Sequence, residues 1–303
     1  MSSATSWKTL GRVAPGEIEE ARLQVHHALQ LVSIAVGRAI IEPRDDDSHT
    51  ALTWQNHNHR GEDVVGLWRG EPIAQAGGLR AGLEPADLVL TLGSDEDPFA
   101  ETLELAGKTQ DDGIAWLREK LGPHGVDPAA IVLDIYYDMP DHPVANGAPF
   151  STDLKSERAE LGRYYANLAP YLRKLPGLHT GATPWRTWPH HFDGDVLMPH
   201  GPTESPMDRI IGVGLSSGDV HYSEPYVYVT IWPHADESAQ LPDLPAGQWH
   251  RGHFFGAVLT GSALVGEDDR QEERVQGFLA TAVATGRELL GAAGDFWDFR
   301  DDV

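Results

Sequence analysis

The 303-residue sequence contains no cysteine, which excludes disulfide bonds, thiolate metal ligands and cysteine nucleophiles. It also lacks an apolar run close to the ~18 residues that a membrane-spanning helix needs. Its first residues do not form the basic and then apolar regions of a secretory signal. These absences predict a cytoplasmic protein that has no membrane partner.

Positive charge is scarce as well. Lysine and arginine together number 23, of which five are lysine, against 46 aspartates and glutamates, so the formal net charge is −23. A surface this acidic repels phosphate backbones and anionic membranes. Nucleic acid is therefore not an expected partner, and a small-molecule ligand or substrate is.

Several common catalytic motifs are missing. The sequence has no phosphate-binding Gly-x-x-x-x-Gly-Lys-Ser/Thr, no Gly-x-Gly-x-x-Gly, no Gly-x-Ser-x-Gly and no His-Glu-x-x-His. Nucleotide-binding loops, the nucleophile elbow of α/β-hydrolases and the zinc helix of metalloproteases are thus not indicated. Any function has to be argued from the side chains that are present.

Hydrophobic periodicity predicts an α+β protein, mainly antiparallel sheet with packed helices. Apolar spacings of three and four indicate helices, whereas short apolar runs bounded by turn residues indicate strands. The expected helices are Glu17–Ile41, Ser94–Ala106, Thr109–Leu121, Ser151–Leu175 and Arg270–Leu290. The expected strands are Thr50–Gln55, Val64–Trp68, one or two within Leu79–Leu92, Thr183–Leu197, Arg209–Leu215, Pro225–Trp232 and His253–Val265.

The predicted elements follow the same order twice: helix, several strands, helix. The segment Pro123–Phe150 carries five prolines and is the expected connection, so residues 1–150 and 151–303 form the two predicted halves. One continuous domain is the alternative. Thr53–Val64 resembles Thr187–Val196 if a short gap is allowed, which leaves open whether the halves arose by duplication.

The segment Trp185–Asp195 concentrates two indoles, two imidazoles and two carboxylates in eleven residues. If it is extended, alternation places His191 and Asp193 on one face. An imidazole nitrogen and a carboxylate oxygen would then be close enough to bind one ion or to share one proton. This His-x-Asp pair is the start of a predicted site.

Two more side chains complete that site if the strand ends converge. Glu224 precedes the predicted strand Pro225–Trp232, and His250 precedes His253–Val265. The predicted metal ligands are therefore His191, Asp193, Glu224 and His250, a set typical of one zinc, iron, manganese or nickel ion. His190 or Tyr226 would lie behind them. Glu224 and His190 are the candidate catalytic residues.

The leading interpretation is a metal-dependent enzyme, of hydrolase or oxygenase type, that acts on a small molecule. The alternative is a non-catalytic protein whose aromatic pocket binds an apolar or sugar-like ligand. A structural or oligomer-forming protein is the third reading, and the oligomeric state stays open. The predicted pocket residues are Trp185, Trp188, Tyr226, Trp232 and Trp249.

Three blocks of the sequence carry a resemblance to a known family. They are Trp-Pro-His-His-Phe-Asp at 188–193, Ser-Glu-Pro-Tyr-Val-Tyr at 223–228, and Gly-Gln-Trp-His at 247–250 with Gly-Ala-Val-Leu at 256–259. Together they resemble an uncharacterised family of bacterial proteins that pairs such blocks. The resemblance implies that His190, His191, Asp193, Glu224 and His250 matter, and it assigns them no activity.

Overall fold

The computed structural model describes residues 7–57, 66–200, 208–234, 239–266, 270–291 and 299. The chain divides into two compact units. We call Glu17–Ala166 with Arg186–Phe192 the N-terminal unit. The C-terminal unit consists of Met1–Gly16, Asn167–Trp185 and Asp193–Val303. The division falls within helix α3 (Lys155–Leu178), which contributes residues to both units.

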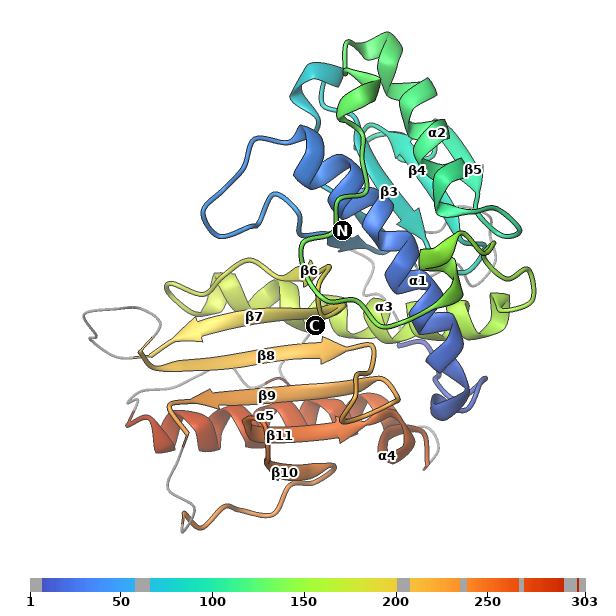
Figure 1. Ribbon diagram of the computed structural model, residues 1–303. Coiled ribbons are helices and arrows are strands. Elements are labelled where there is room, and N and C mark those ends of the chain that lie inside the picture. Colours follow the sequence, from blue (N-terminus) through green and yellow to red (C-terminus); the bar gives the residue numbers. More distant parts are fainter. Residues whose placement is uncertain are drawn as a thin grey trace. The chain divides into compact units, whose positions relative to one another are not determined.

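The N-terminal unit contains a five-stranded antiparallel sheet in which the strands pair in chain order. Each strand is short, and β3 and β4 are almost completely buried. The strands are β1 (Thr53–Gln55), β2 (Leu67–Arg69), β3 (Arg80–Glu84), β4 (Val89–Gly93) and β5 (Glu101–Glu104) (Figure 1).

Helix α1 (Glu19–Val32) continues into a π-helical segment, η2 (Ser33–Arg38), and packs on β3 and on helix α2 (Gln110–Leu121). The approach to α2 depends on Gly113, because a Cβ atom there would lie 2.6 Å from Leu31 Cδ1. Short 3-10 turns complete the described elements: η1 (Pro15–Ile18), η3 (Ala74–Ala76), η4 (Gly122–His124), η5 (Pro128–Ala130) and η6 (Pro143–Asn146).

The predicted helix Ser94–Ala106 is wrong, since the segment forms a turn followed by strand β5. Ser94 Oγ accepts hydrogen bonds from the backbone N–H groups of Glu96 and Asp97, at 3.2 and 3.1 Å. A serine that bonds the backbone in this way favours a turn over a helix interior. The residues that follow then pair with β4.

The sheet of the C-terminal unit is also antiparallel, with the strand order β10-β11-β9-β8-β7 within that unit. Strand β10 was not predicted, and the predicted strand His253–Val265 ends at Thr260, where a short helix begins. The strands are β7 (Asp193–Pro199), β8 (Ile210–Ser216), β9 (Tyr226–Trp232), β10 (Gln248–Arg251) and β11 (Phe255–Thr260).

One face of this sheet is apolar and carries helix α5 (Gln271–Leu289), which packs on β8, β9 and β11 (Figure 1). Helix and sheet approach closely at Gly286, where a Cβ atom would lie 3.1 Å from side-chain atoms of Ile211 and Ile231. Strand alternation places a different set of residues on the opposite face. We call it the polar face; it includes Asp193, Ser216, Tyr226, Tyr228, Thr230 and His250. The short helix α4 (Gly261–Val265) follows β11.

The predicted strand Thr183–Leu197 is interrupted. Strand β6 (Arg186–Trp188) ends before Pro189, and residues 189–192 form a turn closed by a hydrogen bond of 2.9 Å from Phe192 N to Trp188 O. Phe192 has a φ of +53°, in the left-handed region. His191 therefore lies in a turn, so strand alternation does not relate it to Asp193.

These two antiparallel sheets and their helices confirm the predicted α+β class. Helix α2 follows its predicted bounds closely, and α5 begins and ends within one residue of prediction. In the described parts of the chain, no helix is both long and apolar enough to cross a membrane.

Candidate functional site

Half-buried Asp193 and buried Tyr228 form a hydrogen-bonded pair on the polar face of the C-terminal unit. Tyr228 Oη donates a hydrogen bond of 2.7 Å to Asp193 Oδ2. The tyrosine ring lies over Gly214, since a Cβ atom there would be 2.5 Å from Tyr228 Oη. Burial, reinforced by the Asp193 carboxylate, raises the pKa of Tyr228 well above its usual value. Tyr228 is therefore a neutral donor.

Asp219 organises the connection between β8 and β9. Its Oδ2 accepts from Tyr226 Oη at 2.7 Å, and its Oδ1 accepts from the backbone N–H groups of His221 and Tyr222 at 2.7 and 2.9 Å. Burial acts to raise the pKa of Asp219, but these hydrogen bonds outweigh it and the pKa is lowered. The connection is thereby held as a folded loop.

This loop brings three imidazoles together at the edge of the polar face. His250 Nε2 lies 3.2 Å from His253 Nδ1, and the ring of His221 stacks on that of His253 with centroids 3.6 Å apart. Tyr222 Oη lies 2.8 Å from His250 Nδ1. The ring of Phe254 stacks on that of His250, with centroids 4.3 Å apart. We call His221, His250 and His253 the imidazole cluster.

The electrostatics of the cluster favour neutral rings. Partial burial lowers the pKa of His250, and the nearby His221 lowers it further. The pKa of His253 is lowered by burial and by both other imidazoles of the cluster. Asp219 opposes these effects without cancelling them. Neutral imidazoles carry the lone pairs that metal ions bind.

The four predicted metal ligands are not gathered in one place. Asp193 lies on β7 and His250 on β10, four inter-strand spacings of about 4.8 Å away, so these two residues are separated by about 19 Å or more. Glu224 Oε2 accepts a hydrogen bond of 2.5 Å from Ser262 N at the start of α4. His191 belongs to the N-terminal unit. Of the four, only His250 joins the imidazole cluster.

The residues of the predicted aromatic pocket also have separate surroundings. Tyr226 and Trp232 stand at opposite ends of β9, six residues or about 20 Å apart. Trp249 donates from Nε1 to the carbonyl oxygen of Pro242, at 2.8 Å. Trp185 is buried beneath the guanidinium of Arg173. The fifth residue, Trp188, belongs to the N-terminal unit.

In the N-terminal unit, the turn that carries His190 is hydrogen-bonded to helix α1. The carbonyl oxygen of Pro189 accepts hydrogen bonds from His26 Nε2 at 2.7 Å and from Gln30 Nε2 at 3.0 Å. Gln30 Oε1 accepts in turn from Tyr137 Oη at 2.6 Å. Burial lowers the pKa of His26 to about 3, so its ring is neutral and Nε2 carries the proton that it donates.

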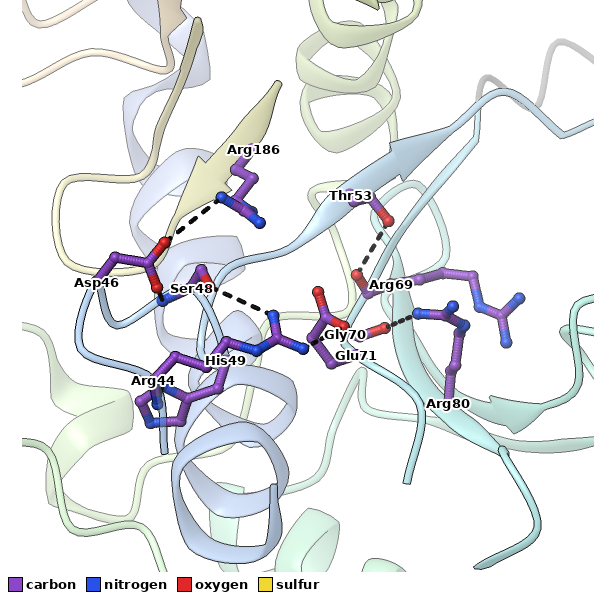
Figure 2. Close-up of polar contacts among 10 residues, drawn as sticks. All are labelled: Arg44, Asp46, Ser48, His49, Thr53, Arg69, Gly70, Glu71, Arg80 and Arg186. Atoms are coloured by element: carbon purple, nitrogen blue, oxygen red, sulfur yellow. Dashed lines mark hydrogen bonds and ion pairs between the residues drawn. The ribbon is translucent and has the colours of Figure 1, made fainter. Parts of the chain in front are cut away.

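A group of arginines in the same unit has carboxylate partners. Arg44 pairs with Glu71 at 3.1 Å and Arg186 with Asp46 at 3.9 Å (Figure 2). Arg69 and Arg80 each lie 3.0 Å from Asp95 Oδ1. Because these cations are paired within the chain, the group is better understood as fastening strands and loops than as an anion site.

Sequence reasoning identified His250 as a site residue but did not include His221 or His253. The signal available was a set of four histidines within 33 residues, namely His221, His234, His250 and His253. In the part of the chain that the structure describes, no group of three or more His, Asp or Glu side chains is already arranged to hold a metal ion. His250 and His253 are directed at one another, while His221 lies parallel to its neighbour.

No protein-family model, no curated protein and no solved structure matches this chain. The membership in a bacterial family that the three sequence blocks suggest thus stays a prediction. The function has to be argued from the residues described above.

Proposed function

We propose that the protein is a metal-dependent enzyme of hydrolase type that acts on a small molecule, with its metal centre at the imidazole cluster. The observation that carries this proposal is the separation of 3.2 Å between His250 Nε2 and His253 Nδ1. Two nitrogens that bind one tetrahedral zinc ion at about 2.0–2.1 Å lie about 3.3 Å apart. His250 Nε2 and His253 Nδ1 would therefore both be able to hold one divalent ion once the proton between them has left.

The surroundings support this assignment. Tyr222 Oη lies where it can accept a hydrogen bond from His250 Nδ1–H, and in that tautomer the Nε2 lone pair is available for a metal. His221 is exposed, and it would supply a third ligand if its ring turned out of its stack with His253. Three imidazoles with one open position are a common ligand set of catalytic zinc, which activates bound water.

Metal analysis of the untagged protein tests the proposal. We expect about one equivalent of zinc, iron, manganese or nickel per chain, and zinc titration by calorimetry should give one site. His250→Ala and His253→Ala should each weaken zinc binding at least ~10-fold, because each removes a ligand. Tyr222→Phe should weaken it less. His234→Ala, an exposed histidine of the same unit outside the cluster, is the matched control.

The catalytic part of the proposal needs its own assay. Hydrolysis of a panel of small esters, amides and lactones should be lost on chelation and restored by metal, and should be absent in His250→Ala. Full metal occupancy in both alanine variants, or no binding of any of the four metals, would contradict the metal centre. Bound metal without metal-dependent hydrolysis would contradict the enzyme class alone.

A further inference from the structure

A continuous row of aromatic and imidazole rings lies in the N-terminal unit, independent of the imidazole cluster. Tyr136 and Tyr137 have centroids 4.9 Å apart, and Tyr137 lies 5.8 Å from His190. His190 in turn lies 6.2 Å from Trp188 and 4.3 Å from His191. We call these five residues the ring row. It joins the segment 131–142 to the turn that follows β6.

The ring row is partly open to solvent. Tyr136 is 47% exposed, His191 is exposed, and the remaining three residues are half-buried. Large rings left at the surface in contact with one another are a feature of ligand sites more than of cores.

Side chains of helix α1 also hold the ring row in place. Tyr137 is bonded to Gln30, and Gln30 and His26 both bond the carbonyl oxygen of Pro189. The two buried side chains of α1 thus fix the turn that presents His190 and His191. A preformed surface of this kind loses little conformational entropy when a ligand binds.

The charges around the row select the ligand. Arg38 lies over the ring of Tyr136, 4.5 Å from its centroid, and pairs with Asp134 Oδ2 at 2.9 Å. The row therefore already holds one organic cation between an aromatic face and a carboxylate. Residues 131–142 carry three aspartates, Asp134, Asp138 and Asp141, and no lysine or arginine. The negative face of an aromatic ring attracts cations, and these carboxylates add to that attraction.

We propose that the ring row is a binding site for a small organic cation that carries a substituted ammonium or guanidinium group. The cation would lie against the rings of Tyr136, Tyr137 and Trp188, and the carboxylate of Asp134, which now pairs with Arg38, would add to the attraction. An anionic ligand is disfavoured by the same carboxylates and by the net charge of −23. The site shares no residue with the proposed metal centre, and its ligand needs no metal.

The test compares choline with 3,3-dimethyl-1-butanol, which has the same shape without the charge. Binding to chelator-treated protein would be measured by calorimetry and by saturation-transfer NMR of the methyl signals. We expect saturable 1:1 binding of choline, with the neutral analogue at least ~5-fold weaker. Tyr136→Leu and Trp188→Leu should each weaken choline ~2- to 5-fold. Trp249→Leu, which removes a tryptophan outside the row, should leave binding unchanged.

Substitution of Arg38 provides a second, independent test of the proposal. Arg38→Met removes the cation that now lies over Tyr136 while it keeps an apolar side chain at that position, so choline should bind more tightly than to the wild type. Because Tyr136 is 47% exposed, its substitution should leave the melting temperature within a few degrees. Absence of saturable choline binding, equal binding of the neutral analogue, or weaker choline binding in Arg38→Met would each overturn the proposal.

Discussion

His26 Nε2 donates a hydrogen bond of 2.7 Å to the carbonyl oxygen of Pro189, 163 residues later in the chain. The imidazole is 2% exposed, and its Nδ1 is buried without a hydrogen-bond partner among the described residues. A protonated ring would have to bury a second N–H without an acceptor, close to the positive charge of Arg22. The structure therefore stabilises the neutral form alone.

This arrangement makes the stability of the protein depend on pH. The folded pKa of His26 is about 3, whereas an unfolded histidine has a pKa near 6.5. The unfolded state thus binds more protons between these values. The contribution of His26 is complete above about pH 6.5, and it falls by up to about 1.4 kcal/mol per unit as the pH drops toward 3.

His26→Gln keeps a donor at the position of Nε2 but removes the titrating group. Urea unfolding between pH 7 and pH 4.5 should show a flatter decrease of the unfolding free energy in this variant, by up to one proton. The control is His124→Gln, at an exposed histidine of the same unit. Identical pH slopes in His26→Gln and the wild type would contradict the prediction.

Gly214 provides the space for the ring of Tyr228. A Cβ atom at this position would lie 2.5 Å from Tyr228 Oη and 2.7 Å from the carbonyl oxygen of Gly194, so neither neighbour can yield easily. Gly214→Ala should lower the free energy of unfolding by about 1–3 kcal/mol. Gly177→Ala should raise it by about 0.5–1 kcal/mol, because that helical glycine has open space around its Cα. Chemical denaturation of both variants measures this contrast.

Local signals were sufficient for part of the fold. Helix α2 begins where the sequence predicts, because Thr109 and Asp112 cap each other's backbone N–H groups within one turn. The bounds of β8 and β9 were likewise predicted to within one residue. The turn after Trp188 was not, because its left-handed Phe192 is fixed by packing against Trp68 and Tyr165 from distant parts of the chain.

The candidate site was less predictable for a related reason. The sequence identified His250 as a candidate metal ligand. It grouped His250 with Asp193 and Glu224, which share neither its strand nor its neighbours. His250 lies beside His253, and His253 is stacked on His221, which belongs to the β8–β9 connection. Such a contact depends on the tertiary fold of the loop and leaves no periodic pattern in the sequence.

Substitution of Arg69 and substitution of Asp95, which form an ion pair, should lower the free energy of unfolding by different amounts. Arg69 is completely buried and also donates to the carbonyl oxygen of Gly93 at 2.7 Å, whereas the side chain of Asp95 is 69% exposed. Arg69→Met should cost about 2–4 kcal/mol through lost packing and unsatisfied acceptors. Asp95→Asn should cost less than ~1 kcal/mol, because its charge is largely in water. Equal losses in urea unfolding would contradict this asymmetry.

Glu224 distinguishes the metal site inferred from the structure from the one indicated by the sequence. Its carboxylate accepts from Ser262 N at the start of α4, beside the cap that Thr260 Oγ1 forms with Ala263 N. Glu224→Gln retains an acceptor oxygen, so it should change the unfolding free energy by less than ~0.5 kcal/mol. If the metal lies at the imidazole cluster, this variant should keep full zinc stoichiometry and affinity in calorimetry, as should His191→Ala. The opposite result, in which Glu224→Gln loses zinc and His253→Ala retains it, would place the metal centre at the ligand set predicted from the sequence. A carboxylate that only caps a helix should not affect metal binding at a cluster that it does not ligate.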